Sequence, residues 1–461
     1  MRVAIIGGGI AGCGIAMALD RIGVEFTLFE KRTSLVGGPP MCHLHAGGNL
    51  YPDIDDAQRL QLLEESLELM RFFPQAVDYR PTIIAVPKSD SNDPEELAKR
   101  AKILQEQYAK LCQKDPKNRL LGDPKHYVTT FTRADLTRLG RLSQPNPPRC
   151  PDEWMIPFAK EVDLERIKFP VLLVQEFGLN IFRIAATAQT LLEKRDIRLG
   201  TEVIDIQNDQ GYLIRYSQNG SIHEERYDYL INAAGFESGR IDDALGYGRK
   251  RFVEFKAAYV TRWESRYHWP EVIFHGQRGT KEGMGQFTPY AGGYVQLHGM
   301  SEEITLFEDG LVRNEAPSAQ PKLPQKYIEM IEKSWDKELS VTRTRRAISH
   351  LGRFIPAFQS ARPAAKPLYG AQQIPGTQAT LRAAEVSFEN SYARCEIVKA
   401  SSITAMAKAI AKDVGFTGEI PIDTPKLDSK KLDEAAMRIA ADRGYPPQMG
   451  LLGYPSFHEC P

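Results

Sequence analysis

The feature that most constrains this chain is a glycine-rich turn close to its start. An apolar run over residues 3–6 reads as a buried strand, and Gly7, Gly9 and Gly12 follow it with G-x-G-x-x-G spacing. An Ala-rich helical pattern comes next, and a second apolar run covers residues 25–29. This order of strand, tight turn, helix and strand predicts the opening unit of a Rossmann-like parallel sheet.

Each glycine of the turn has a physical task. Gly7 permits the tight strand-to-helix turn, Gly9 lets the backbone approach a pyrophosphate, and Gly12 lets the helix pack closely on the sheet. A diphosphate would sit at the positive end of the helix, so we expect Ile10 and Ala11, in its first turn, to contact the same group. The turn therefore predicts a dinucleotide site.

An acidic residue at the end of the second run supports this interpretation. Glu30 follows Gly7 by 23 residues, where a carboxylate can bind a ribose hydroxyl and disfavour a 2′-phosphate. We place Glu30 and its neighbour Lys31 at the adenosine end of the ligand. The alternative is a glycine-rich turn without a ligand, which the flanking strands and the acid make the weaker reading.

Composition limits the remaining classes of protein. A chain of 461 residues is too long for one compact core, so two or three domains are expected. Lys+Arg and Asp+Glu number 59 each, and this balance gives no sign of a nucleic-acid partner. Hydrophobic residues at 42 % and charged residues at 26 % are typical of a globular protein.

Metal, disulfide and membrane signals are weak. The six cysteines form no C-x-x-C pair and suit a reducing compartment, and the pair His43 and His45 has no evident third ligand, so we expect no metal. No window approaches eighteen uninterrupted apolar residues, so we expect no transmembrane segment. The first strand begins too early to leave room for a leader peptide, and the expected compartment is the cytoplasm.

Two further segments narrow the family. Residues 42–52 read CHLHAGGNLYP, a loop of small residues, and residues 227–238 read YDYLINAAGFES, a strand that ends in a small-residue turn. With the opening unit, they resemble the flavin amine-oxidoreductase superfamily, which includes D-amino-acid oxidase, glycine oxidase, sarcosine oxidase and 2-hydroxyglutarate dehydrogenase. The resemblance implies FAD rather than NAD. FAD is the longer cofactor, and several chain segments usually hold it.

The resemblance also implies which residues lie along the flavin. The 42–52 loop would pass the isoalloxazine ring, and the 227–238 turn would lie under the cofactor. The residues implied to bind it are His45, Ala46, Gly47, Val203, Ala233, Ala234 and Gly235. His45 stands where dimethylglycine and sarcosine dehydrogenases carry a histidine joined covalently to the flavin, and both a covalent bond and a non-covalent contact remain open.

One departure from the family concerns the last part of the chain. The family has a compact Gly-rich turn before its last helix, whereas here Gly370 and Gly376 stand apart from the helix that we expect over residues 391–414. Either a helix dipole or a cation, Arg382 or Arg394, would then stabilise an anionic flavin. The late Gly-Asp pair of aromatic hydroxylases is missing from this region, which weakens a monooxygenase interpretation.

The candidate catalytic residues are His45, Tyr290, His298 and Arg353. Residues 284–300 are expected to form a strand that carries Tyr290 and His298 over the flavin, although core packing would explain them equally well. Arg353 and Arg362 flank an aromatic stretch, and Arg353 offers a guanidinium fork for a substrate carboxylate, with a surface arginine as the alternative. For an alcohol substrate, His298 would take the hydroxyl proton.

The expected fold class is α/β. A Rossmann-like FAD-binding domain, with a parallel sheet, helices and a small antiparallel sheet, would interleave with an α+β substrate domain built on an antiparallel sheet. The FAD-binding domain is expected over residues 1–77, 170–250 and 341–414. The substrate or cap domain is expected over residues 78–169 and 251–340, and a C-terminal extension over residues 415–461.

The function expected from these observations is that of an FAD-dependent oxidoreductase, either an oxidase or a dehydrogenase. It would take a hydride from a C–N or C–OH carbon of a small amino- or hydroxy-carboxylate substrate. The electrons would pass to oxygen, a quinone or a carrier protein, and the residues leave these three open. The alternatives are an FAD-dependent monooxygenase or halogenase of a biosynthetic pathway, and a non-catalytic flavin-binding partner protein.

Overall fold

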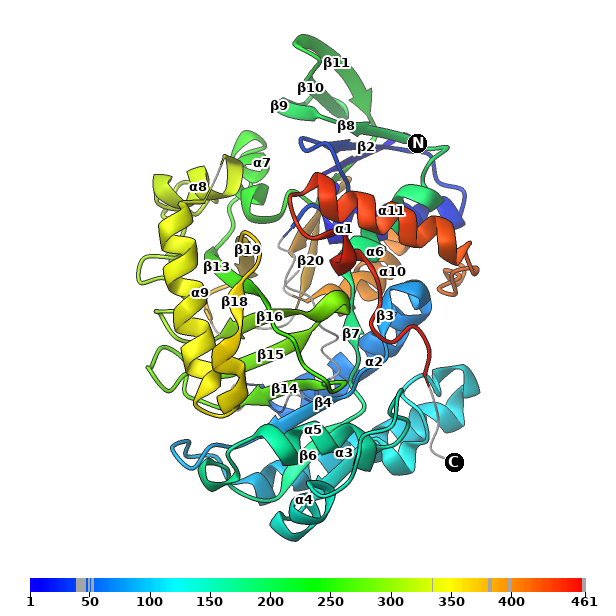
Figure 1. Cartoon of the computed structure of the whole chain (residues 1–461). Coiled ribbons are helices and arrows are strands. Elements are labelled where there is room, and N and C mark those ends of the chain that lie inside the picture. The colour runs from blue at the N-terminus through cyan, green and yellow to red at the C-terminus, as the bar shows by residue number, and fades with distance from the viewer. Residues whose placement is uncertain are drawn as a thin grey trace.

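The computed structural model describes residues 1–38, 47–48, 50, 54–333, 335–379, 384–396 and 399–457. In these residues a parallel sheet follows the order β20-β21-β12-β1-β2-β8, and only the edge strand β20 is antiparallel to its neighbour (Figure 1). Its strands are β1 (Val3–Ile6), β2 (Phe26–Glu30), β8 (Asp196–Leu199), β12 (Tyr229–Asn232), β20 (Glu385–Glu389) and β21 (Tyr392–Glu396).

Burial explains why the opening run becomes the centre of this sheet. All four residues of β1 are buried, and Val3 pairs with Phe26 of β2 on one side and Tyr229 of β12 on the other. A parallel strand covered on both faces needs a continuous apolar run rather than alternation. Three helices pack together beside it: α1 (Ile10–Arg21), α6 (Ile181–Leu191) and α10 (Ile403–Asp413).

A larger, mainly antiparallel sheet forms the second half of the molecule. Its strands are β4 (Thr82–Ala85), β5 (Val128–Phe131), β6 (Val171–Val174), β13 (Arg251–Arg262), β14 (Glu271–Phe274), β15 (Gly285–Pro289), β16 (Tyr294–Gly299), β17 (Leu311–Arg313), β18 (Arg362–Pro363) and β19 (Leu368–Pro375). Helix α9 (Lys337–Gly352) packs against β13, β15 and β16. The opposite face of β13 contributes Ala258 and Val260 to the core shared with the first sheet.

The predicted α/β fold class is confirmed, with its parallel sheet and its second half built on an antiparallel sheet. The predicted domain boundaries differ from the sheet membership in two places. Strand β6 follows residue 170, and β18 and β19 follow residue 341, yet all three belong to the larger sheet. The sheet to which a strand belongs is decided by its pairing with strands distant in sequence. The apolar residues of one strand do not show which other strand it will pair with.

Smaller elements complete the molecule. A separate antiparallel sheet contains β9 (Thr201–Asn208), β10 (Tyr212–Gln218) and β11 (Ser221–Tyr227), and it lies at the top of Figure 1. The remaining strands are β3 (Val77–Asp78) and β7 (Gly178–Leu179), and the remaining helices are α2 (Asp56–Phe72), α3 (Pro94–Lys114), α4 (Arg133–Leu139), α5 (Pro151–Glu161), α7 (Ser238–Ala244), α8 (Gln325–Glu332) and α11 (Ser429–Asp442). Helix α11 packs against α6.

The helix expected over residues 391–414 is wrong in its first part. Tyr392–Glu396 instead forms β21, fully buried, which pairs in parallel with β12, and helix α10 begins only at Ile403. Ser391 has φ of 53° in the tight turn from β20 into β21. The sequence of β21 has no strict alternation, because both of its faces are covered, and such a run resembles a buried helix segment.

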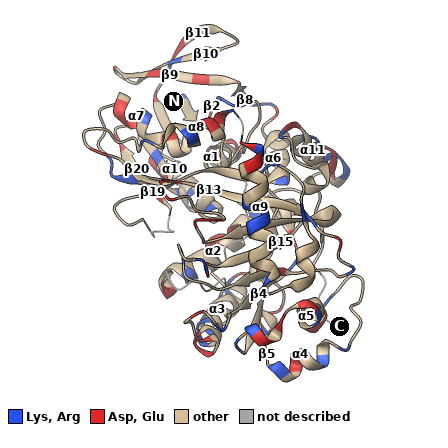
Figure 2. Cartoon of the chain, turned by 60° about the vertical axis from the view of Figure 1, so that its left-hand side comes forward, with Lys and Arg blue, Asp and Glu red and all other residues tan. Residues whose placement is uncertain are grey.

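Two features of the surface bear on the expected partners. Positions of Lys and Arg are interspersed with positions of Asp and Glu along the helices at both ends of the molecule (Figure 2). Among the helices of the described ranges, none is both long enough and apolar enough to cross a membrane.

Candidate active site

A cavity of about 1030 Å³ is lined by residues of both large sheets. The lining includes Gly7, Gly9 and Glu30 beside the parallel sheet and Lys256 and His298 on the larger sheet. This volume is at the upper end of the range of about 300–1,000 Å³ that is usual for ligand sites. The cavity therefore offers room for a long ligand that extends from the glycine-rich turn to the larger sheet.

The three glycines of the turn occupy the positions that their predicted tasks require. Gly7 has φ of 103°, and a Cβ atom there would lie 2.3 Å from the carbonyl oxygen of Ala233. A Cβ at Gly12 would lie 1.8 Å from the carbonyl oxygen of Gly7, so any side chain would separate α1 from the turn. Gly9 lines the cavity, and a Cβ there would meet no atom within 4 Å. The backbone at Gly9 is thus open to the cavity, with Ile10 and Ala11 beside it.

Glu30 connects the turn to the end of β2. Its Oε2 accepts a hydrogen bond from the Gly8 N–H at 2.6 Å, and its Oε1 accepts one from the Arg32 N–H at 2.7 Å. Because a carboxylate has about four acceptor positions, both oxygens retain capacity for a ribose hydroxyl. Lys31 also lines the cavity and forms an ion pair with Glu237. The predicted ribose contact stays a prediction, supported by this placement.

The small-residue turn after β12 is held by its own side chains. Asn232 donates hydrogen bonds to the Ser238 carbonyl at 2.9 Å and the Tyr392 hydroxyl at 2.7 Å, and it accepts one from the Ala234 N–H at 3.2 Å. Ser238 donates to the Gly235 carbonyl at 2.5 Å. The predicted residues Ala233, Ala234 and Gly235 of this turn line the cavity, as does Val203 of β9. The polar ends of the motif thus shape the turn, and its small residues face the ligand space.

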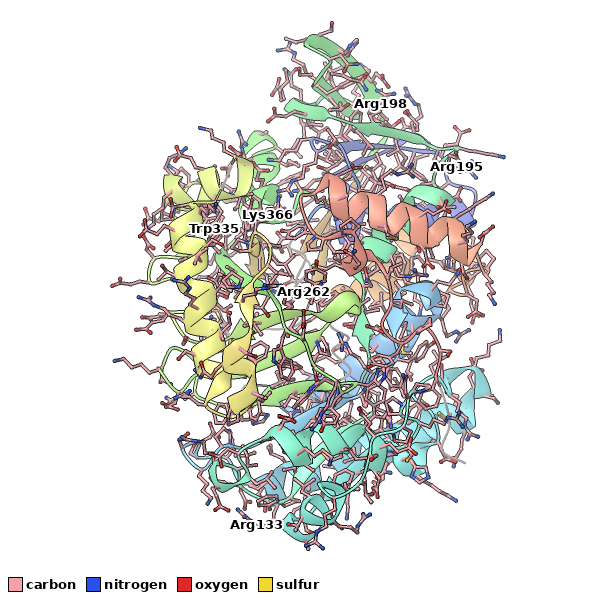
Figure 3. All side chains as sticks on the ribbon, viewed as in Figure 1. Arg133, Arg195, Arg198, Arg262, Trp335 and Lys366 are labelled. Carbon is pink, nitrogen blue, oxygen red and sulfur yellow. The ribbon has the colours of Figure 1, made fainter. Side chains whose placement is uncertain are left out.

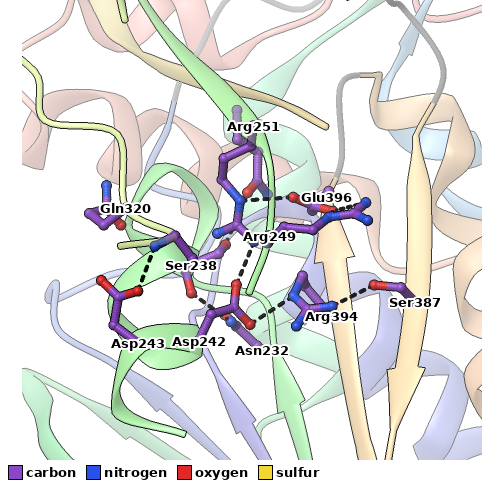
Figure 4. Close-up of polar contacts among 12 residues, drawn as sticks. Asn232, Ser238, Asp242, Asp243, Arg249, Arg251, Gln320, Ser387, Arg394 and Glu396 are labelled. Atoms are coloured by element: carbon purple, nitrogen blue, oxygen red, sulfur yellow. Dashed lines mark hydrogen bonds and ion pairs between the residues drawn. The ribbon is translucent and has the colours of Figure 1, made fainter. Parts of the chain in front are cut away.

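A buried ion network lies behind this turn (Figure 4). Asp242 forms ion pairs with Arg251 and Arg394, and Glu396 forms ion pairs with Arg251 and Arg249. The network connects α7, β13 and β21 across the junction of the two sheets. Arg394 was a predicted cation for an anionic flavin, but its Nε lies 2.7 Å from Asp242, and Arg394 is not among the described residues that line the cavity.

Three cations and a histidine lie close together in the lining of the cavity. Lys256 Nζ lies 2.7 Å from Glu254 Oε2 and donates to Gln372 Oε1 at 3.1 Å, and Arg278 also pairs with Glu254. Lys399 lies just before α10 and lines the same cavity. Burial and the charges of Lys256, Lys399 and Arg278 lower the pKa of His298 to about 3. The imidazole is therefore neutral at neutral pH, and its buried Nδ1 has no hydrogen-bond partner among the described residues.

The sequence interpretation missed Lys256, Arg278 and Lys399. One signal was present, because Glu254 and Lys256 stand at alternate positions of the otherwise apolar run FVEFKAAYV. Alternation places both side chains on one face of a strand, where an apolar run would not otherwise carry charge. Arg278 and Lys399 lie in loops, and only the tertiary structure brings them to the same place.

The other predicted catalytic residues lie elsewhere. The Tyr290 hydroxyl donates to Gln296 Oε1 at 3.3 Å; Gln296 lines the cavity, whereas Tyr290 is not among its described lining residues. Arg353 follows the end of α9 and pairs with Glu282 at 2.7 Å, and it too is absent from the described lining. The position of Arg353 gives no support to a role in carboxylate binding, because Glu282 already occupies its guanidinium.

The predicted flavin loop falls partly outside the described residues. His45 and Ala46 lie outside them, as does Arg382. Gly47 is described: it has φ of 88°, and a Cβ there would lie 2.7 Å from the carbonyl oxygen of Arg59 in α2. Gly47 thus packs against a helix, and the described lining of the cavity does not include it. The roles of these residues toward the flavin stay predictions.

Comparison with known proteins supports the prediction that the cofactor is FAD. Residues 2–134 match the family model DAO, described as FAD dependent oxidoreductase. A curated relative, the anaerobic glycerol-3-phosphate dehydrogenase subunit A1 of Haloferax volcanii, is 26 % identical over 248 residues. The match covers 53 % of this chain and 38 % of that protein, so the chain spans well under half of the relative's length.

Solved structures show the same fold over nearly the whole chain. Glycine oxidase from Geobacillus kaustophilus has a TM-score of 0.58 at 14 % identity and covers 93 % of this chain and 100 % of its own. L-α-glycerophosphate oxidase from Mycoplasma pneumoniae, solved with FAD bound, has a TM-score of 0.56 at 13 % identity and covers 93 % and 97 %. The segment that matches the FAD dependent oxidoreductase model contains the glycine-rich turn and indicates FAD as the cofactor, and the solved structures show that the chain shares their fold.

Proposed function

We propose that this protein takes a hydride from a C–N or C–OH carbon of a small amino- or hydroxy-carboxylate. The supporting observation is a single cavity that joins the diphosphate-binding turn to a cationic floor on the larger sheet. We use the term cationic floor for Lys256, Arg278 and Lys399. A cavity that is lined by both sheets has room for a substrate beside FAD, which supports the proposal.

The residues along the cavity fit the cofactor. The open backbone at Gly9 suits a diphosphate at the start of α1, and Glu30 suits the ribose. Gly235 has φ of 62°, and a Cβ there would meet no atom within 4 Å, so the second turn also leaves its backbone accessible. When bound, FAD supplies a two-electron acceptor for the substrate hydride.

The charge of the floor indicates an acidic substrate. The cationic floor has three cations, and one acid, Glu254, pairs with two of them, Lys256 and Arg278. The Arg278 side chain is 27 % exposed, so a ligand in the cavity can reach its guanidinium. A carboxylate that binds there forms charge-assisted hydrogen bonds, and Arg presents the planar fork that matches its two oxygens.

His298 is the residue best placed to take a proton from the substrate. Its pKa of about 3 results from burial and from the nearby cations. A bound carboxylate would offset those cations and raise the pKa, so His298 would become a stronger base only when substrate is present. Gln296, on the same strand, would orient the polar group on the reacting carbon, and the Tyr290 hydroxyl would hold Gln296 in place.

The test is anaerobic bleaching of the FAD-loaded protein. We expect flavin absorbance near 450 nm, about the usual position for oxidised flavin, to fall on mixing with an amino or hydroxy acid and no NAD(P)H. The panel includes glycerol 3-phosphate, because a cationic floor also accepts a phosphate and because two of the similar proteins are named for this compound. Reduction by NAD(P)H alone would instead support the monooxygenase alternative and contradict this proposal.

A further inference from the structure

The loop that follows β2 is held in a costly backbone conformation. Val36 has φ of 55°, in the left-handed region that β-branched residues rarely adopt. Such a conformation costs on the order of 1–3 kcal/mol and persists only where the surroundings impose it. The Val36 N–H donates to the Gly8 carbonyl at 2.7 Å, and Leu35 and Val36 are both buried. The next residues, Gly37 and Gly38, line the cavity.

One side chain from the C-terminal extension secures this loop. Arg443 directly follows α11, and its guanidinium donates to the carbonyls of Leu35 at 2.6 Å and Val36 at 3.1 Å, and to Ser34 Oγ at 3.1 Å. The Arg443 side chain also lies 5.9 Å from the centre of the Phe182 ring in α6. Arg443, more than four hundred positions away in the chain, thus supplies hydrogen bonds to the backbone carbonyls of the strained segment.

The same extension also contacts the other half of the molecule. Gly444 has φ of 72°, and after this turn the Tyr445 hydroxyl donates to the Pro367 carbonyl at 2.9 Å. Lys366 Nζ lies 5.1 Å from the centre of the Tyr445 ring, and Figure 3 labels Lys366 near this junction. Residues 443–445 therefore join the loop after β2 to the connection between β18 and β19, which belongs to the larger sheet.

The charges at this junction leave a positive potential beside the cavity. Arg32 lines the cavity and donates to the Gly37 carbonyl at 2.9 Å, and burial together with the charges of Arg32 and Arg443 lowers the pKa of Lys366. Burial and Arg32 in turn lower the pKa of Arg443 to about 10, while Glu30, Cys13 and Tyr445 oppose the change. A diphosphate next to the glycine-rich turn would relieve the mutual repulsion of these cations.

We infer that Arg443 is a positioning residue for FAD, and that the C-terminal extension forms part of the cofactor site. Arg443 fixes residues 34–36 against Gly8, so the strained loop closes the diphosphate end of the cavity. This inference rests on FAD as the cofactor and is independent of the substrate proposed above. An assay of cofactor binding alone therefore tests it.

The experiment compares Arg443→Gln with Arg438→Gln, which changes an exposed arginine of α11, five residues before Arg443. Apoprotein is titrated with FAD and the Kd is read from the quenching of flavin fluorescence, without substrate. We expect Arg443→Gln to weaken FAD binding by about tenfold or more, and Arg438→Gln to leave it within about twofold. Arg443→Lys keeps the charge but cannot reach all three acceptors, and we expect an intermediate Kd.

A second measurement separates this role from general stability. We expect the rise in Tm on adding saturating FAD to be smaller in Arg443→Gln than in the unmodified protein, because ligand stabilisation follows Kd. We also expect Val36→Gly, which removes the strain, to restore part of the FAD affinity in the Arg443→Gln background. An unchanged Kd with equally lowered Tm in apoprotein and holoprotein would overturn the inference. If Arg443→Gln does not fold, the Kd of Arg443→Lys decides in the same way.

Discussion

Lys256 and Glu254, two positions apart on β13, form an ion pair of 2.7 Å on the face of the larger sheet that lines the cavity. Their side chains are only 7 % and 5 % exposed. Arg278 approaches the same carboxylate from a loop, so one acid is shared by two cations. Because two cations share one carboxylate, the cluster keeps positive charge that a substrate carboxylate can neutralise.

Arg278 is expected to determine substrate affinity. Changing Arg278→Gln removes the more exposed cation of the floor, and we expect KM for the acidic substrate to rise by about 10- to 100-fold, corresponding to one charge-assisted contact of about 1.5–3 kcal/mol. Steady-state kinetics on the best substrate of the panel measure this change. Arg353→Gln is the matched control, and we expect it to leave KM nearly unchanged because Glu282 holds that arginine at the surface. Equal effects of both substitutions would contradict the assignment.

His298 is expected to make stability depend on pH in a defined direction. Its pKa in the folded protein is about 3, below the ordinary value of 6.5, so the unfolded chain binds more protons between these two values. The neutral imidazole therefore contributes its full stability above pH 6.5, and this contribution falls as the pH decreases toward 3. Urea unfolding of the protein and of His298→Asn at several pH values measures the difference. If the unmodified protein became more stable relative to His298→Asn as the pH falls, the predicted direction of the pH dependence would be wrong.

Gly12 is expected to be intolerant of any side chain. A Cβ in Gly12→Ala would lie 1.8 Å from the Gly7 carbonyl, and the helix would have to move away from the turn. We expect a loss of stability of about 1–3 kcal/mol together with weakened FAD binding. Gly248→Ala serves as the control, because a Cβ at exposed Gly248 meets no atom within 4 Å. Thermal melts with and without FAD test both statements, and a Gly12→Ala protein that binds FAD normally would refute them.

Asp242 is expected to be essential for folding rather than for turnover. Asp242→Asn would remove the buried carboxylate that pairs with Arg394 and one of the two that pair with Arg251, which costs about 3–5 kcal/mol. The neighbouring Asp243 is exposed and accepts hydrogen bonds from Ser318 and the Ala319 N–H, so Asp243→Asn should cost about 0.5–1.5 kcal/mol. Denaturant unfolding of the two variants measures the contrast. Similar values for both would exclude a special role for the network.

Local sequence patterns predicted the cofactor end of the site well. The spacing of Gly7, Gly9 and Gly12 depends on contacts within one strand–turn–helix unit, and the structure places these glycines as their tasks require. The strand assignment failed for Tyr392–Glu396, because a strand buried on both faces lacks the alternation that distinguishes it from a helix. The position of Arg353 could not be predicted from the sequence either, because its partner Glu282 is distant in the chain.

The sequence by itself thus predicted the fold class and the glycine-rich turn, because both depend on residues close together in the chain, and the resemblance carried by three of its segments predicted FAD as the cofactor. Only the tertiary structure decided the cationic floor, where Lys256, Arg278 and Lys399 meet from a strand and two loops. Only the tertiary structure showed that Arg443 reaches back to the loop after β2. Such contacts depend on the pairing of strands that are distant in sequence and on how the C-terminal residues pack back onto the first sheet. A local sequence pattern specifies neither of these.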